Sequence, residues 1–283
     1  MALALVVTGV IAQETGGMTS KKGEAILPEA DDWALVIDAT PVLNYFGRFL
    51  STAGSTSPTW GYPGAPLAIT GKMFKDEKTA YRGMIRLGFG STTLNNFVDD
   101  NVNTTDPNAM VNDSRKVAYN NIVLGGGMEW RRGKTRLQGF YGGMLMFGIG
   151  GSKNTYSYGN SYSGTNTTPT STTTWTPSIA TSSAPSRITE LKAGSTMMIA
   201  LRGFIGAEYF IFPKIAVGAE FGWGLGMTST GEGEVTTQTW DGTALNTKST
   251  TSKTGKSNTF GFDTDVNGTQ MVPTGALTLA LHF

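Results

Sequence analysis

Apolar and polar residues alternate with a period of two over much of the chain. In residues 193–212, apolar side chains such as Met197 share one parity, and polar or small ones such as Arg202 share the other. Residues 215–226 repeat the pattern after a break of only three residues, 212–214. A period of two is typical of a β-strand with two unlike faces. This part of the sequence therefore predicts a hairpin with a tight turn.

The same pattern predicts eight strands in all. They cover 33–40, 67–75, 79–94, 117–130, 135–151, 193–212, 215–226 and 274–283. Three short turns (76–78, 131–134 and 212–214) alternate with four long connections (41–66, 95–116, 152–190 and 231–273). This rhythm is typical of outer-membrane β-barrels, which have short periplasmic turns and long extracellular loops. We expect an all-β fold, a closed antiparallel transmembrane β-barrel over 33–283 with both termini periplasmic.

Two of the long connections carry distinct sequence signals. Asp241-Gly242 is a strong signal for a tight β-turn, so the fourth connection is expected to hold a β-ribbon outside the barrel or an extra strand pair. The second option would make ten strands, and we favour eight. Residues 153–190 are rich in serine and threonine and poor in charge, which favours a mobile, low-complexity loop.

Composition narrows the class of protein. Charged residues make up 15% of the 283 residues, and 22 basic residues face 21 acidic ones. An even charge balance disfavours a nucleic-acid partner, which would select a basic surface. There is no run of about 18 apolar residues, which excludes a helical membrane protein. The 38 glycines and the 10% aromatic content fit transmembrane strands.

The polar parity carries charges, which a dry protein core would reject. In hydrocarbon a sheet must close so that no edge is left unpaired, and its apolar face then turns toward lipid. The charged residues expected in the lumen are Asp38, Lys72, Arg82, Arg86, Glu129, Arg136, Arg202, Glu208 and Glu220. Because buried charges are costly unless paired, this near-balanced set favours a closed salt-bridge network. The alternative is a narrow ion-conducting path.

Aromatic residues gather beside the short turns and the chain end. They are Trp33, Tyr81, Trp130, Tyr209, Phe212 and Phe283. Aromatic side chains at one level of a barrel are typical of the interface between lipid and water. We expect these residues to form a periplasmic girdle.

The N-terminus suggests export. Residues 1–12 are almost wholly apolar and end in Val10-Ile11-Ala12, which fits a signal-peptide core and its cleavage site, although a basic leading segment is missing. A buried strand or helix is the alternative. Residues 13–32 are expected to form a periplasmic leader.

The C-terminal segment resembles a known sequence signal. The terminal sequence LTLALHF (277–283) alternates and ends in phenylalanine, and it resembles the C-terminal assembly signal of Gram-negative outer-membrane barrels. With the eight-strand rhythm, the chain resembles small barrels of the OmpA/OmpX kind, at the level of pattern from residue 33 onward. This resemblance implies a bacterial outer-membrane location. Residues 40–50 also resemble a sequence segment found in some barrels of this class, and this resemblance implies no particular function.

Residues 41–50 break the alternation. Thr40 is a credible helix N-cap, Pro41 suits the first helical position, and apolar residues follow at helical spacing. A short amphipathic helix is expected here, and continuation of the first strand is the alternative.

Residues suited to catalysis are scarce. Without cysteine there is no thiolate, and the one histidine, His282, is expected at the periplasmic rim. The glycine strings do not open a phosphate loop. Asp99-Asp100, with Asp106 and Asp113, could hold a divalent cation, but the spacing matches no calcium loop and favours solvated side chains. We expect no enzyme activity, cofactor or metal.

The sequence thus favours an integral outer-membrane barrel with a structural or binding role. Its expected partners are outer-membrane lipid and, through the loops, another envelope protein or an extracellular ligand. The alternative is a small passive diffusion channel, and a lipid-modifying enzyme is a more distant third.

Overall fold

The structure, a computed structural model, describes residues 18–39, 69–102, 105–176, 178–242, 247–263 and 275–283. The described residues form strands, turns and connections, without a helix. No segment among them is a helix long and apolar enough to cross a membrane. The predicted signal segment 1–12, the start of the leader and the predicted helix at 41–50 lie outside the described residues.

Fourteen strands are found in the described part of the chain. They are β1 (Trp33–Asp38), β2 (Ile69–Asp76), β3 (Thr79–Asp99), β4 (Met110–Arg132), β5 (Leu137–Ser157), β6 (Thr170–Thr174), β7 (Ala180–Ser183), β8 (Ser186–Lys192), β9 (Thr196–Phe212), β10 (Ile215–Thr230), β11 (Glu234–Trp240), β12 (Thr247–Lys253), β13 (Ser257–Asp263) and β14 (Gly275–His282).

Eight of these strands form a ring in one antiparallel sheet. β1 to β5 pair in sequence order, β5 pairs with β9, and β9 pairs with β10. β10 then pairs with β14, and β14 pairs with β1, so each of the eight has two neighbours. The eight ring strands correspond to the eight predicted from the sequence. The predicted all-β class is confirmed, together with a ring of eight strands.

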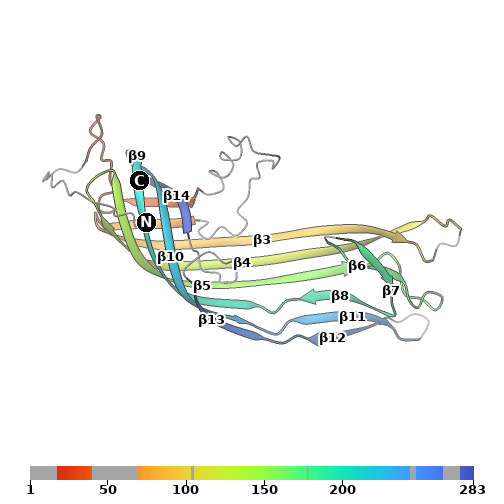
Figure 1. Cartoon of the computed structure of the whole chain (residues 1–283). Helices are drawn as coiled ribbons and strands as arrows, with labels where there is room; N and C mark the ends of the chain where they lie inside the picture. The colour runs from red at the N-terminus through yellow and green to blue at the C-terminus, as the bar shows by residue number, and fades with distance from the viewer. Residues whose placement is uncertain (1–17, 40–68, 103–104, 177, 243–246, 264–274) are drawn as a thin grey trace, which may run out of the picture.

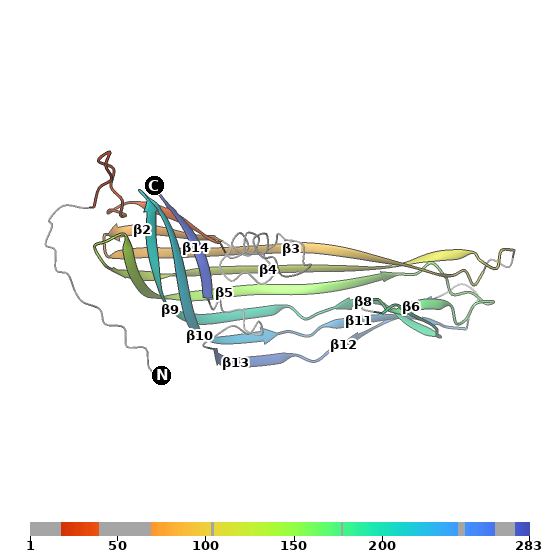
Figure 2. The same ribbon diagram turned by 45° about the horizontal axis from the view of Figure 1, so that its top comes forward.

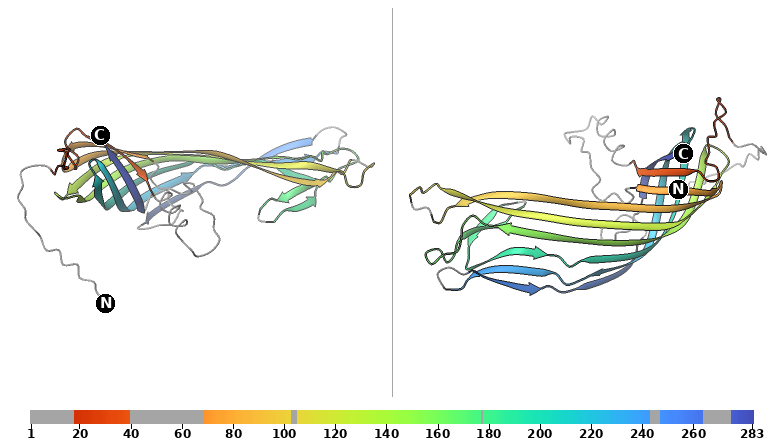
Figure 3. Two further views of the ribbon diagram at one scale, coloured as in Figure 1. Left: turned by 90° about the horizontal axis from the view of Figure 1, so that it is seen from above. Right: turned by 180° about the vertical axis from the view of Figure 1, so that it is seen from behind.

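The long connections prolong one side of the ring. β3, β4 and β5 run well past it, β8 pairs with the end of β5, β11 with β8, and β12 with β11 (Figures 1 and 2). We call this extension the blade: residues 91–99, 110–118 and 152–157 with β6, β7, β8, β11 and β12. Seen from behind, the blade projects to one side of the ring (Figure 3).

The blade corrects one expectation and resolves another. The serine- and threonine-rich stretch 153–190 is not simply a loop, because it contains β6, β7 and part of β8. Threonine is β-branched and favours strands, so low complexity did not imply disorder here. The ribbon expected around Asp241-Gly242 is the β11–β12 hairpin, and it joins the blade and leaves the ring at eight strands.

The two faces of the ring are unlike. Along β9, Leu201 on the outer face is 60% exposed, whereas Arg202 on the inner face is 1% exposed. On the other ring strands large apolar side chains also lie outside, and the inner face carries charged and small residues together with buried methionine and phenylalanine side chains. The ring differs from a soluble barrel in its outer face, which is apolar, and in the buried charges on its inner face.

The leader covers the end of the ring at the short turns. Ile26 is 2% exposed and belongs to an apolar cluster whose other buried members are Val36, Phe210, Ala216 and Ala280. The backbone N–H of Lys214 donates to the Ile26 carbonyl at 3.2 Å, and the Lys214 side chain forms an ion pair with Asp32. The leader therefore fills this end of the ring with its own apolar side chain.

Candidate functional site

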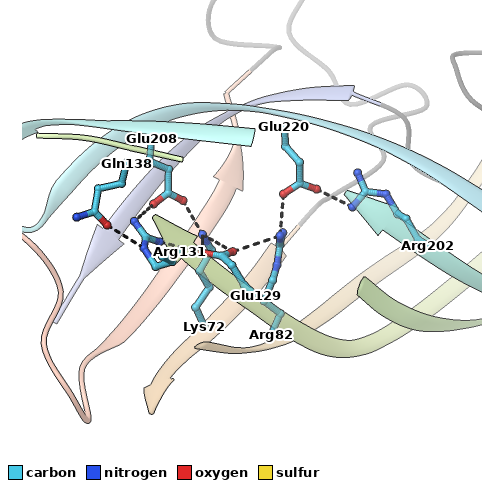
Figure 4. A network of polar contacts seen from close by, with 8 residues as sticks. All are labelled: Lys72, Arg82, Glu129, Arg131, Gln138, Arg202, Glu208 and Glu220. Atoms are coloured by element: carbon cyan, nitrogen blue, oxygen red, sulfur yellow. Dashed lines mark hydrogen bonds and ion pairs between the residues drawn. The ribbon is translucent and has the colours of Figure 1, made fainter. Parts of the chain in front are cut away.

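Antiparallel pairing brings distant charged residues to one level inside the ring. The network contains Lys72 from β2, Arg82 from β3, Glu129 and Arg131 from β4, Arg202 and Glu208 from β9, and Glu220 from β10 (Figure 4). Each of these positions lies on the inner parity of its strand. The alternation of the strands therefore directs all seven side chains toward the same interior.

Glu129 and Glu208 form one half of this network. Lys72 lies between them, 3.0 Å from a Glu129 oxygen and 2.5 Å from a Glu208 oxygen. Arg131 also bridges the two, at 2.9 Å from Glu129 and 2.8 Å from Glu208. The Arg131 Nε donates to Gln138 at 3.1 Å, which holds the guanidinium in place.

Glu220 forms the other half. It accepts from Arg82 at 2.8 Å and from Arg202 at 2.6 Å. Arg82 also lies 3.4 Å from Glu129, so it joins the two halves. Figure 4 shows the resulting chain of contacts running from Gln138 to Arg202.

Aromatic rings support the cations. Lys72 lies 4.8 Å from the centre of the Phe140 ring, and Arg82 lies 4.1 Å from that of Phe204. Such contacts are strongest where the cation is shielded from water. The network side chains are 2% exposed or less, so they hold each other without solvent screening.

Two apolar layers enclose the network. The leader cluster around Ile26 lies toward the short turns. On the other side lies a second buried cluster, formed by Met84, Val123, Met144, Met146, Met198 and Ala200. The interior therefore alternates apolar, charged and apolar layers.

The network consists of ion pairs between buried side chains. Three carboxylates meet four cations, and every carboxylate contacts at least two of them. The groups contributed by β2, β3, β4, β9 and β10 tie the opposite sides of the ring together.

The structure separates the nine charged residues expected in the lumen. It brings together Lys72, Arg82, Glu129, Arg202, Glu208 and Glu220. Arg86 is half-buried on the inner face of β3, nearer the blade than Arg82, and forms no ion pair with another described residue. Arg136 lies at the turn end and donates to the backbone carbonyls of Phe210 and Ile211. The backbone of Asp38 is part of β1, and its side chain is not among the described parts of the structure.

Two network residues, Arg131 and Gln138, were not anticipated. The run Arg131-Arg132-Gly133-Lys134 reads as a turn, but β4 continues to Arg132, and the chain reverses around Gly133, whose φ is +129°. The available signal was parity, because Arg131 lies two positions after Glu129 and so shares its face.

The aromatic residues expected to form a girdle lie on the outer face at the turn end of the ring. All six are more than 40% exposed: Trp33, Tyr81, Trp130, Tyr209, Phe212 and Phe283. The cross-strand neighbour Tyr141 extends the group, with its ring centre 5.8 Å from that of Trp130. These residues form a band around the outside of the ring.

His282 and Asp113 are both buried. His282 lies at the turn end of the ring, where it was expected, but its side chain points inward: it is 5% exposed, and its ring centre lies 5.4 Å from that of Phe74 and 5.2 Å from that of Phe210. Asp113 is fully buried in the blade, where it accepts hydrogen bonds from the backbone of Gly159 and from Thr172. Asp113 therefore anchors β6 to β4 and is not a solvated side chain.

Comparison with known proteins adds no relative. No family model, no curated protein and no solved structure matches the chain.

Proposed function

We propose that the ring is a closed β-barrel inserted in a bacterial outer membrane, with a structural or binding role and without catalytic activity. The observation that carries this proposal is the outward apolar face of the ring. Soluble proteins rarely expose contiguous apolar patches larger than a few hundred Å². Here exposed leucine, isoleucine, phenylalanine or methionine side chains lie on the outer face of every one of the eight ring strands.

The height of this apolar face fits a lipid bilayer. Tyr209 and Met197 on β9 are 12 positions apart, and Tyr81 and Phe89 on β3 are 8 apart. At about 3.3 Å per residue and a tilt of about 40°, these spans rise roughly 30 Å and 20 Å. The apolar band of outer-membrane barrels is about 25 Å tall, between these two values.

The interior favours a sealed barrel over a diffusion channel. The salt-bridge network occupies the middle of the ring, and the leader fills its turn end. An ion crossing here would have to displace buried, paired charges, which is costly. We propose that the barrel holds its shape through this network and that the blade, on the far side from the short turns, presents the binding surface to an extracellular ligand or another envelope protein.

Fluorescence quenching by brominated lipids tests the membrane insertion. Two single-tryptophan variants are compared in vesicles: one retains Trp223, which is on the outer face, and the other retains Trp175, which is buried in the blade. We expect quenching of Trp223 by bromine on the acyl chains and none of Trp175. Equal lack of quenching would refute insertion.

Planar-bilayer recording tests the sealed interior. We expect little conductance from the wild type. Glu208→Ala opens the network and should raise the leak, whereas Glu234→Ala removes an exposed blade carboxylate and should not. A large steady wild-type conductance that Glu208→Ala leaves unchanged would favour the diffusion channel.

A further inference from the structure

A pocket of about 320 Å³ lies where the ring meets the blade, beyond the methionine cluster. It is lined by Tyr119, Asn120, Asn121, Gly150, Gly151, Ser152, Ala193, Gly194, Thr196 and Thr230. Its volume is at the lower end of the roughly 300–1,000 Å³ typical of small-molecule sites. The pocket is shallow and opens to the outside of the fold, so a ligand can reach it without passing the charge network.

One cross-strand row forms the floor of this pocket. Asn121 on β4 pairs with Gly150 on β5, Gly150 pairs with Thr196 on β9, and Thr196 pairs with Thr230 on β10. These residues share the inner parity of the ring. Glycine at position 150 leaves the middle of the row flat, so a ligand can approach the sheet between the polar side chains.

Tyr119 forms a flat wall beside this row. Its ring lies against Gly90 of the neighbouring strand, where a Cβ atom would be 2.6 Å from the Tyr119 Cε1 atom. Yet Tyr119 is 54% exposed. The ring is therefore in contact with β3 and still leaves about half of the residue's surface open to a ligand. An aromatic face carries partial negative charge and attracts the weakly positive C–H groups of a flat ligand.

The polar groups of the pocket are all neutral. The Asn121 Oδ1 is buried and accepts no hydrogen bond from any described residue. The Thr196 and Thr230 hydroxyls lie 3.2 Å apart, and Ser152 adds a third hydroxyl. No lining residue is charged. A buried acceptor without a partner is costly, so rotation of the Asn121 amide toward a ligand that brings a donor would be favourable.

We propose that this pocket binds the ring of a neutral saccharide. Such a ligand has a C–H face that can lie on Tyr119 and hydroxyl groups that can donate to Asn121 and exchange hydrogen bonds with the threonine pair. A nucleotide or an acidic sugar is disfavoured because the lining offers no cation. This inference goes beyond the proposed membrane role and does not rest on it, since the pocket exists in the fold whether or not the ring is inserted.

Saturation-transfer NMR on the detergent-solubilised full chain tests the proposal. The probes are the neutral sugars maltose, lactose and N-acetylglucosamine, with glucuronic acid and sialyllactose as acidic counterparts. At about 10 mM, which reveals Kd values in the millimolar range, we expect transfer to at least one neutral sugar. No transfer to any neutral sugar, or stronger transfer to the acidic ones, would overturn the proposal. Stronger transfer to the acidic sugars would point to Arg86, which lies one row closer to the charge network.

Matched variants locate the binding. Tyr119→Ala and Asn121→Ala should each weaken binding at least about tenfold. Tyr119→Phe keeps the aromatic face and should bind within about threefold of the wild type. Phe97→Ala removes a comparably exposed ring from the blade and serves as the control. Binding that survives both alanine variants would place the sugar elsewhere and refute this site.

Discussion

Removing Glu129 should destabilise the ring more than removing any exposed carboxylate. Its carboxylate is fully buried and contacts three cations: Lys72 at 3.0 Å, Arg131 at 2.9 Å and Arg82 at 3.4 Å. Breaking a buried ion pair costs about 3–5 kcal/mol because the remaining charge is left without compensation. Glu129→Ala leaves four cations with two carboxylates. We therefore expect the free energy of unfolding to fall by about 5 kcal/mol, the upper end of this range.

Urea unfolding in lipid vesicles, followed by tryptophan fluorescence, measures this loss. The control is Glu234→Ala, whose exposed pair with Lys192 at 3.4 Å is worth about 0–1 kcal/mol. The double variant Lys72→Met/Glu129→Leu removes one charge of each sign and leaves Arg131 on Glu208 and Arg82 on Glu220. It should recover most of the stability. The network would be refuted if Glu129→Ala lost no more stability than Glu234→Ala, or if the double variant lost as much as Glu129→Ala.

Three further results are expected. Leu201→Arg, on the outer face, should lower the free energy of unfolding in vesicles by about 2–4 kcal/mol. In the same urea titration, the control Ile188→Arg on the blade should change it by no more than about 0.5 kcal/mol. Equal losses would mean that the outer face does not meet lipid. Gly206→Ala adds a methyl group against an inward phenylalanine ring and a backbone carbonyl, and it should lower the free energy of unfolding by about 1–3 kcal/mol. Gly126→Ala, which has open space around its Cβ, should leave the thermal unfolding midpoint almost unchanged. Burial raises the pKa of Tyr158 from 10.0 to about 12, so its contribution to blade stability is full below pH 10 and is lost as the pH rises toward 12; absorbance at 295 nm should show this late ionisation, and Tyr158→Phe should abolish it.

Much of the ring was predictable from local pattern. A strand turns successive side chains to opposite faces, so alternation alone indicated where the eight ring strands lie and which residues face inward. The same parity singled out Lys72, Glu129 and Glu208 as interior charges. Where parity was set aside in favour of a turn signal, as at Arg131, the prediction missed a central member of the network. Its neighbour Arg136 was included, although it binds backbone carbonyls at the turn end.

Partners across the ring depend on closure, which no local window contains. Glu129 and Lys72 are 57 positions apart, and Glu220 and Arg82 are 138 apart. Their distances follow from the register of each strand pair and from the β1–β14 pairing that joins the two ends of the chain. A slip of one residue would turn every inward charge to the outside.

Tertiary packing also decided the features that lack periodicity. Ile26 lies in a polar leader, and only the apolar end of the ring shows why it is buried. The strands of the serine- and threonine-rich stretch depend on Asp113, 59 positions before Thr172. The row from Asn121 to Thr230 exists only because the registers of three strand pairs align. The sequence by itself determined which face each residue takes, because that is a property of the single strand; tertiary structure decided which residues meet, because that is a property of the whole sheet.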